Sequence, residues 1–413
     1  MQINLHSLLQ SKLVKNYTAT SLAVGLSQLI SLLAIPFIAK LIGPEEFGLF
    51  NASITVTAVL IVLCALRIES ALFIASDTEV VLVNKIFNSI MYVTCIIFYF
   101  LFVIASFVID FDGVQNPILL MLLTFSIAHF EFTIQYNVRF GYFSQNVIMR
   151  LVRAASFPFV AFLYAVFQSL NSDSILLIFI FSHLIPLFFS RSRNIFHIVD
   201  FNNTSQFASG FSKVIKSVRI QVPTHIVRTI GANIVFLSAM LFSVDFEQVG
   251  FFALAVKLTL APCAVFIVGV CDVFKRTLIN EPKKALGQYI YLSLFLLLVS
   301  VSLILCIELA SKHLINIFFD ESWIVTTEYM RALYPLIFAT IILSPITYVY
   351  LILDKQGLDL SWQIYNFISG SVAVYIGLQY SLLTTVWLWS SISSLNLLIS
   401  ALLCMHILKQ RSM

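Results

Sequence analysis

The residues with the clearest chemical meaning in this sequence are a few charged side chains that interrupt long apolar runs. Arg228 and Lys257 each lie about eight residues inside such a run, or about 12 Å of helix from one end. A charge at the centre of a membrane-spanning helix costs about 2.5–3.5 kcal/mol, so it needs a partner or a water-filled cavity. No acid lies at a comparable depth in these two runs, and two cations there would suit a phosphate or pyrophosphate. The alternative is that each cation pairs with an acid or extends to the membrane surface.

A second group of charges lies in the first half of the chain. Glu131 sits deep in its apolar run, where an acid is a candidate carrier of a proton or cation, or an ion-pair partner. Arg67 and Glu69 lie near the end of another run, and residues two apart on a helix are expected to point to different faces. Arg153 lies one turn into a third run, so Arg67, Glu131 and Arg153 are expected to form a network. The alternative is a set of boundary anchors with one ion pair.

Two further patterns concern gating and energy source. Glu328 and Arg331 are one turn apart, so we expect them to pair with each other; the alternative is a role in gating. The sequence has no phosphate loop of the GxxxxGK[ST] type and no His, Cys, Asp or Glu cluster with zinc spacing. We therefore expect no direct use of ATP, no metal site and no cofactor.

Composition indicates what kind of element carries these charges. The chain has 413 residues, of which 60% are hydrophobic and only 11% charged, against about 25% charged residues in soluble domains. The bilayer must therefore be the solvent for most of the chain. A spanning helix needs about 20 apolar residues. The approximate apolar runs are 17–39, 47–72, 86–109, 117–138, 147–168, 174–190, 221–243, 249–273, 288–310, 326–353, 360–378 and 381–407. The sequence predicts an all-α polytopic membrane protein with twelve transmembrane helices.

The distribution of basic residues predicts the orientation of these helices. With both termini in the cytoplasm, the cytoplasmic segments hold 17 of the 24 Lys and Arg residues, whereas the opposite loops hold only Lys40 and Lys312. Because the basic residues gather at helix ends, the net charge of +4 reflects topology rather than a nucleic-acid surface.

An internal repeat divides the chain near its middle. The segment 44–52, PEEFGLFNA, aligns with 246–254, FEQVGFFAL, at an offset of 202 residues (250 − 48). Each half then holds six helices, and both halves enter the membrane from the same side, as in transporters built from parallel repeats. A long basic connection, 190–220, separates the halves, so we expect one six-helix bundle in residues 1–200 and another in 201–413.

Three segments resemble a known family. The segment 36–48, PFIAKLIGPEEFG, is similar to a P-x-(I/L)-x-R-x-L-G-P-E-x-(F/Y)-G pattern, with Lys40 where Arg is usual. The segment 66–72, LRIESAL, resembles L-R-x-E-x-A-(I/L), and 250–258, GFFALAVKL, resembles a second-half pattern. In this order and with this helix count, the sequence resembles the Wzx-type polysaccharide (O-antigen) flippases. Their superfamily, MOP, also includes the MATE antiporters and the lipid II flippase MurJ.

The resemblance implies a fold and a substrate. It implies two six-helix bundles around a central cavity, and movement of an undecaprenyl-pyrophosphate-linked oligosaccharide from the inner to the outer leaflet of the bacterial inner membrane. Cationic residues of such proteins meet the anionic diphosphate-sugar head group, and by position these are Arg67, Arg228 and Lys257. Only Arg67 and Lys257 fall within the matched segments; Arg228 rests on depth and charge.

Alternating access is the expected mechanism. Glu131, with Glu69 and Arg153, is the candidate for coupling to a proton or sodium gradient or for salt bridges. The expected partners are the lipid-linked oligosaccharide, membrane lipid, and a polysaccharide polymerase or chain-length protein.

Three rival functions stay open. A MATE-like exporter of small organic cations should have an acidic cavity, whereas the mid-membrane excess here is basic. An O-antigen polymerase or lipid-linked glycosyltransferase usually carries a long outer loop, whereas the longest here, about 311–325, is short. A non-catalytic assembly scaffold would not need a charged midplane.

Overall fold

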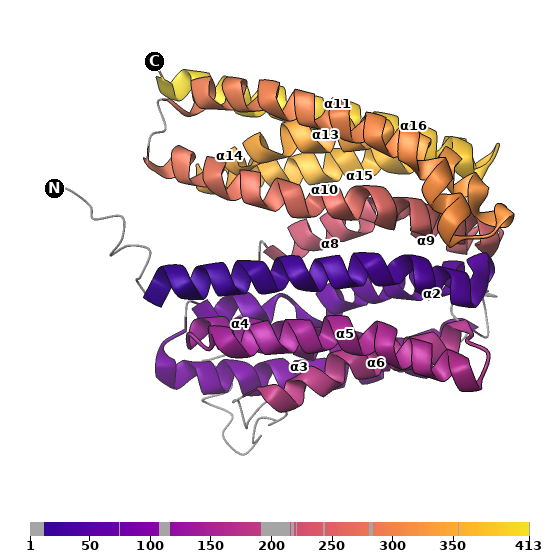
Figure 1. The fold of residues 1–413 in the computed structure, drawn as a ribbon. Coiled ribbons are helices and arrows are strands. Elements are labelled where there is room, and N and C mark those ends of the chain that lie inside the picture. Colours follow the sequence, from indigo (N-terminus) through magenta and orange to yellow (C-terminus); the bar gives the residue numbers. More distant parts are fainter. Residues whose placement is uncertain are drawn as a thin grey trace. The chain divides into compact units, whose positions relative to one another are not determined.

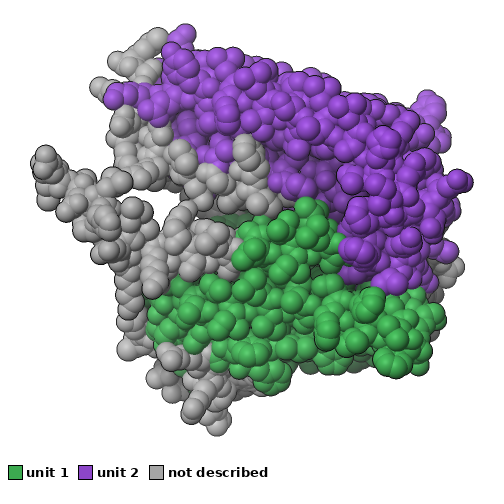
Figure 2. Space-filling view, in the orientation of Figure 1, with its two compact units in different colours: residues 1–34, 53–226 green, residues 35–52, 227–413 purple. Residues whose placement is uncertain are grey.

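Helices form every regular element of the described chain. The computed structural model describes residues 12–73, 75–106, 116–190, 215, 219, 221–242, 244–280, 284–353 and 355–412. Most of the basic connection 190–220 therefore lies outside the described residues. The chain divides into two compact units, coloured in Figure 2. Unit 1 holds residues 1–34 and 53–226, and unit 2 holds residues 35–52 and 227–413.

Unit 1 is a bundle of apolar helices. In Figure 1 its helices α3 to α6 run alongside one another. Its core includes Cys64, Phe87 and Phe132, with the Phe87 and Phe132 rings stacked at 4.0 Å between centroids. Its elements are most of α2 (Lys12–Ala65), η1 (Ile68–Phe73), α3 (Asp77–Ser106), α4 (Pro117–Arg139), α5 (Phe143–Phe167), α6 (Ser172–Leu184), η2 (Ile185–Phe189) and the start of α8 (Gln221–Ala232).

Unit 2 has the same all-helical character. The helices α15 and α16 pack so closely at Gly377 that any larger side chain there would collide with the Thr385 backbone. A core cluster joins Phe274, Tyr289, Ile346 and Cys404. Its elements beyond α8 are α9 (Ile234–Leu241), α10 (Phe246–Asn280), α11 (Ala285–Phe318), η3 (Glu321–Val325), α12 (Thr326–Ala332), α13 (Tyr334–Leu343), η4 (Ser344–Tyr348), α14 (Val349–Ile352), α15 (Gln356–Leu378) and α16 (Leu382–Ser412).

The predicted apolar runs have helical counterparts in the described residues. Seven of these helices are long and apolar enough to cross a membrane, and the number is nine if each of two bent pairs makes one span. One of the seven, Gly25–Ala65, consists of two helical halves that meet at Gly43, where φ is 79°. The chain is thus an all-helical, multi-pass membrane protein, and the total of twelve spans stays a prediction.

The two bent pairs have different causes. The pair Gln221–Ala232 and Ile234–Leu241 bends by 66° at Asn233, whose side chain donates to the carbonyl of Thr229 at 2.8 Å. The second pair bends by 44° beside Pro335, which cannot donate a helical hydrogen bond. Such breaks free backbone groups inside a membrane protein and are tolerated where neighbouring groups satisfy them.

The predicted repeat has a direct structural counterpart within unit 2. A Cβ atom at Gly48 would overlap the carbonyl oxygen of Phe246, and a Cβ atom at Gly250 would overlap that of Pro44. The contacts are reciprocal, because the offset of 202 that relates Gly48 to Gly250 also relates Pro44 to Phe246. Only glycine permits two helix starts to cross this closely.

Candidate functional site

A strained turn in unit 1 sets the position of Arg67. The helix α2 ends at Ala65, and both Leu66 and Arg67 have left-handed backbones, with φ of 48° and 55°. Ser70 holds the turn by donating its backbone N–H and its hydroxyl to the Arg67 carbonyl, at 3.0 and 2.8 Å. Residues that are not glycine adopt such a conformation at a cost, and the strain is often found at functional sites.

This turn changes the predicted relation between Arg67 and Glu69. The expectation of different faces assumed a continuous helix and is wrong, because the left-handed turn brings the two side chains together. Arg67 Nη1 lies 3.2 Å from Glu69 Oε1. The Nε atom of Arg67 is buried and has no hydrogen-bond partner among the described residues.

Glu131 extends this charged group through α4. Its side chain is exposed and lies within electrostatic range of both Glu69 and Arg153. No described cation lies close enough to Glu131 to form an ion pair. The structure therefore brings Arg67, Glu69, Glu131 and Arg153 into one electrostatic group, in which Arg67 and Glu69 alone are in direct contact.

Arg153 is positioned by α4 and α6. Its Cζ atom lies 5.6 Å from the centre of the Phe130 ring, and its Nη1 donates to His183 Nε2 at 3.3 Å. His183 Nδ1 is 2.9 Å from the Phe179 carbonyl, which fixes the proton on Nδ1 and leaves Nε2 as the acceptor. His183 is 2% exposed, so it is a buried support for Arg153.

Unit 2 holds the other predicted cations. Lys257 lies deep in the unit on α10, while part of its side chain stays accessible. It makes no ion pair or hydrogen bond with any described residue. A lysine in this position suits an anion that enters from outside the protein.

Arg228 has an acid partner that the sequence did not indicate. Its Nη2 lies 3.1 Å from Asp359 Oδ2 on α15, and Gln363 donates to the other oxygen of Asp359 at 3.1 Å. The side chains of Arg228 and Asp359 are 54% and 25% exposed. Arg228 is thus a half-exposed, paired cation, and it differs from Lys257 in this respect.

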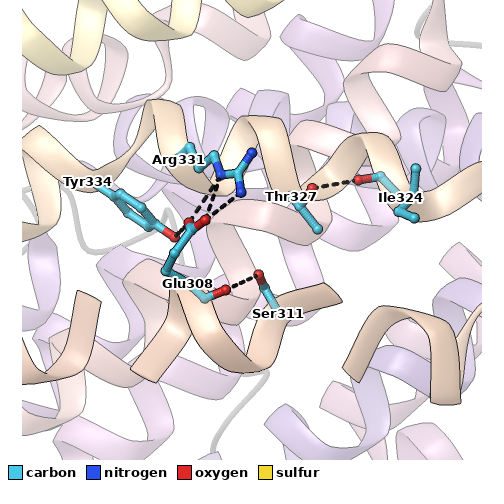
Figure 3. Close-up of polar contacts among 6 residues, drawn as sticks. All are labelled: Glu308, Ser311, Ile324, Thr327, Arg331 and Tyr334. Carbon is cyan, nitrogen blue, oxygen red and sulfur yellow. Dashed lines mark hydrogen bonds and ion pairs between the residues drawn. The ribbon is translucent and has the colours of Figure 1, made fainter. Parts of the chain in front are cut away.

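A third polar group joins α11 to the bent pair of α12 and α13 (Figure 3). Glu308 accepts from Nε of Arg331 at 3.1 and 3.0 Å, is ion-paired with Nη2, and accepts from the Tyr334 hydroxyl at 2.8 Å. The prediction that Arg331 pairs with Glu328 is wrong, because the planar guanidinium meets both oxygens of Glu308. A separation of 23 residues gave no local signal for this pair.

No group of three or more His, Cys, Asp or Glu residues in the described ranges lies close enough to hold a metal ion.

Comparison with known proteins gives the fold a class. No family model matches the sequence, and no curated protein matches it. The inward closed form of the lipid II flippase MurJ matches with a TM-score of 0.73 and 16% identity, over 94% of this chain and 87% of that one. An inward-facing multidrug resistance MATE transporter of the MOP superfamily matches with a TM-score of 0.71 and 15% identity, over 94% of this chain and 96% of that one. A MOP superfamily transporter from Pyrococcus furiosus Vc1 (DSM3638) matches with a TM-score of 0.61 and 12% identity, over 97% of this chain and 95% of that one.

These matches extend over nearly the whole chain at low identity. They define this protein as a polytopic membrane protein with the fold of the MATE and MurJ transporters. More particularly, two of the matched structures are described as transporters of the MOP superfamily, and the likeness to them is one of fold.

Proposed function

We propose that this chain is a flippase for undecaprenyl-pyrophosphate-linked oligosaccharide units. It would move the head group from the inner to the outer leaflet of the bacterial inner membrane by alternating access. It would act as a transporter and not as an enzyme. The polyprenyl tail would stay in lipid while cationic side chains meet the diphosphate.

The observation that supports this proposal best is Lys257. It is a deep-lying cation without an ion-pair partner among the described residues, on the segment that resembles the polysaccharide flippases. A cation of this kind favours an anionic substrate, because an exporter of organic cations would bind its cargo with acids. The Pyrococcus furiosus relative is described as having a binding pocket of reverse polarity that suggests a different function. Pocket polarity therefore varies within this fold, and its sign is informative about the substrate.

Arg67 and Arg228 have supporting roles in the proposal. Each is partly exposed and ion-paired, with Glu69 and Asp359 respectively. An arginine that already has an acid partner can still present its remaining N–H groups to a phosphate. The acid then limits how strongly the empty site binds other anions.

Glu131 is the proposed coupling residue. It is exposed, lies on α4 and faces both a cation and a second acid within electrostatic range. A proton or sodium ion bound there would change the local charge balance and shift the equilibrium between conformations by its differential affinity. Replacement of Glu131 by Gln should abolish the dependence of transport on the ion gradient. Full gradient-driven transport by Glu131→Gln would contradict this role.

The function can be tested in a strain that lacks the gene. Labelled polyprenyl-linked sugar units should collect in the inner leaflet, and the wild-type chain should restore their transfer. Lys257→Ala should fail to restore it, whereas Lys355→Ala, which removes an exposed lysine, should succeed.

Two outcomes would contradict the proposal. Normal outward transfer with unpolymerised units in the deletion strain would indicate a polymerase or an assembly scaffold. Export of an organic cation by the purified chain, with no effect on the lipid-linked units, would indicate a MATE-like antiporter.

A further inference from the structure

An apolar cavity of about 160 Å³ lies within unit 2. It is bounded by α11, by Leu258 of α10, by Met330 of α12 and by Pro36 of α2. Of its lining residues Ser311 alone is polar, and its hydroxyl is directed to the Glu308 carbonyl at 3.5 Å. An apolar cavity of this kind excludes water and accepts apolar matter.

The shape of the cavity follows one stripe of α11. Its lining includes Ile307, Ser311, Leu314 and Phe318, spaced as i, i+4, i+7 and i+11, so they share one helical face. This stripe is about 17 Å long at a rise of about 1.5 Å per residue. One leaflet contributes about 15 Å to the hydrocarbon core of a bilayer, which is about 30 Å thick. The stripe therefore has the length of one lipid chain in one leaflet.

The cavity opens toward the apolar outer face of unit 2. Leu314 and Phe318, which line it, are 50% and 39% exposed, and the neighbouring Leu309 and Ile317 are 75% and 71% exposed. In a membrane-spanning helix, such side chains are surrounded by lipid.

The rim of the cavity carries a positive excess. Four cations, Lys40, Lys257, Lys312 and Arg331, lie next to a lining residue or one turn from it, against two acids, Glu308 and Asp320, so the net charge is +2 (four minus two). Arg331 is held by Glu308 in a bidentate pair (Figure 3). Lys40 is held weakly, because its Nζ lies 3.8 Å from Asp320 and both side chains are well exposed, at 48% and 76%. Lys312 is exposed and forms no ion pair among the described residues.

The position of Lys40 places it at one end of the cavity. It lies one turn beyond Pro36 on the same face of α2, and it precedes the helix break at Gly43. Asp320, its partner, directly follows the lining residue Phe319. Lys312 directly follows Ser311, eight residues or about 12 Å of helix before Asp320, so it lies near the middle of the stripe and not at this end.

We propose that this cavity is a binding site for an anionic phospholipid of the bilayer. One acyl chain occupies the apolar stripe of α11, and the phosphate lies at Lys40. The bound lipid is distinct from the transported substrate, although the cavity borders Leu258, the residue after Lys257, and the proposal does not depend on the function proposed above.

The purified full-length chain can be titrated with phosphatidylglycerol or phosphatidylethanolamine and examined by native mass spectrometry. We expect tighter binding of phosphatidylglycerol. Lys40→Gln should lower that affinity about fivefold, the effect of about 1 kcal/mol per basic residue near an anionic lipid. Lys355→Gln, an exposed lysine outside the rim, should leave the affinity unchanged.

The cavity itself is tested by filling it. Ser311→Phe or Leu314→Trp should abolish labelling of α11 by a phosphatidylglycerol with a photoreactive acyl chain. Leu309→Phe adds a ring to an exposed position of the same helix and should leave labelling intact. Two variants are used because Ser311 is buried and its replacement can disturb folding, whereas Leu314 is half exposed.

Three results would overturn the proposal. The first is equal affinity for the two phospholipids, and the second is acyl labelling that persists in a folded Leu314→Trp chain. The third is displacement of phosphatidylglycerol from the cavity by polyprenyl phosphate at equimolar concentration, which would assign the cavity to the transported lipid.

Discussion

At the scale of single residues, the described charged side chains differ in what offsets the free-energy cost of placing a charge inside the membrane. Arg67 and Arg228 are each partnered by one acid and Arg331 by both oxygens of an acid, whereas Lys257 has no partner among the residues that the structure describes. A membrane-embedded charge without a protein partner needs water or a ligand. The unpartnered lysine is therefore the residue at which a substrate anion has most to contribute.

The first prediction concerns Lys257. Lys257→Met keeps the length of the side chain and removes its charge, so we expect the free energy of unfolding to stay equal or rise. Transport of the lipid-linked unit should fall at least tenfold, because a charge-assisted hydrogen bond contributes about 1.5–3 kcal/mol and about 1.4 kcal/mol is tenfold. Lys257→Arg, which keeps the cation, should retain most activity. Thermal unfolding and the leaflet assay give the two readouts, and an active Lys257→Met chain would exclude an anion site there.

The second prediction separates pairing from binding at Arg228. The pair with Asp359 is partly exposed, so it should contribute less than about 1 kcal/mol to stability. The charge swap Arg228→Asp with Asp359→Arg should keep the unfolding temperature close to wild type and still reduce transport, because the cation moves to α15. Asp359→Asn alone should retain transport. If the swapped chain transports normally, the pair is structural and Arg228 does not contact the substrate.

At the scale of helices, the sequence predicts which segments form helices better than it predicts where those helices end or bend. Hydropathy and length were sufficient to locate the apolar helices, because a bilayer requires each backbone group to be satisfied within its own helix. The end of α2 at Ala65 was missed, since Leu66 and Arg67 are left-handed without a glycine or proline to signal the turn. The bend at Asn233 was missed although Gly231 lies two residues before it, because a single glycine in an apolar run is also tolerated inside a helix.

The partners of the charges were harder to predict than the charges themselves. Arg228 and Asp359 are 131 residues apart, and Arg331 and Glu308 are 23 apart on different helices. Sequence periodicity places a residue on a face of its own helix and carries no information on the helix opposite. The pair of Arg67 and Glu69 was missed because a helical rule was applied across a turn.

The third prediction concerns the crossing of Gly48 and Gly250. Either glycine changed to alanine should destabilise the protein by about 1–3 kcal/mol, because the new methyl group meets a backbone carbonyl that cannot move aside as a side chain would. The two changes should also be non-additive, because both act on the same crossing. Gly287→Ala on α11 meets no atom within 4 Å and should be neutral or stabilising. Unfolding measurements in detergent test this, and additive losses would show that the two contacts are independent.

At the scale of the whole molecule, the boundary between the units runs through continuous helices. Residues 35–52 belong to unit 2, where Phe47 and Phe251 both contact the buried ring of Trp323 at 6.1 and 5.6 Å. The same residues continue at both ends into helical parts of α2 that belong to unit 1. If these helices move as rigid rods, the segment 35–52 must leave unit 2 whenever unit 1 moves.

The fourth prediction follows from this continuity and from the proposed alternating access. The test uses a chain whose six cysteines are replaced by serine. In it, Lys40→Cys with Asp320→Cys can be joined by a thiol cross-linker that spans the length of the lost lysine side chain, because Lys40 Nζ lies 3.8 Å from Asp320 Oδ1. The cross-link should stop transport and leave the lipid-linked units in the inner leaflet.

The control joins two elements that need not separate. Glu308→Cys with Arg331→Cys links α11 to α12 inside unit 2, and its cross-link should leave transport in place. The side chains of both pairs are accessible, at 48% and 76% exposed for Lys40 and Asp320 and 39% and 38% for Arg331 and Glu308, so the reagent can reach both. Unimpaired transport by the chain cross-linked between residues 40 and 320 would show that the segment 35–52 stays with unit 2 throughout the cycle. The helices of α2 would then have to bend at residues 34–35 and 52–53, and the rigid-rod description of the movement would fail.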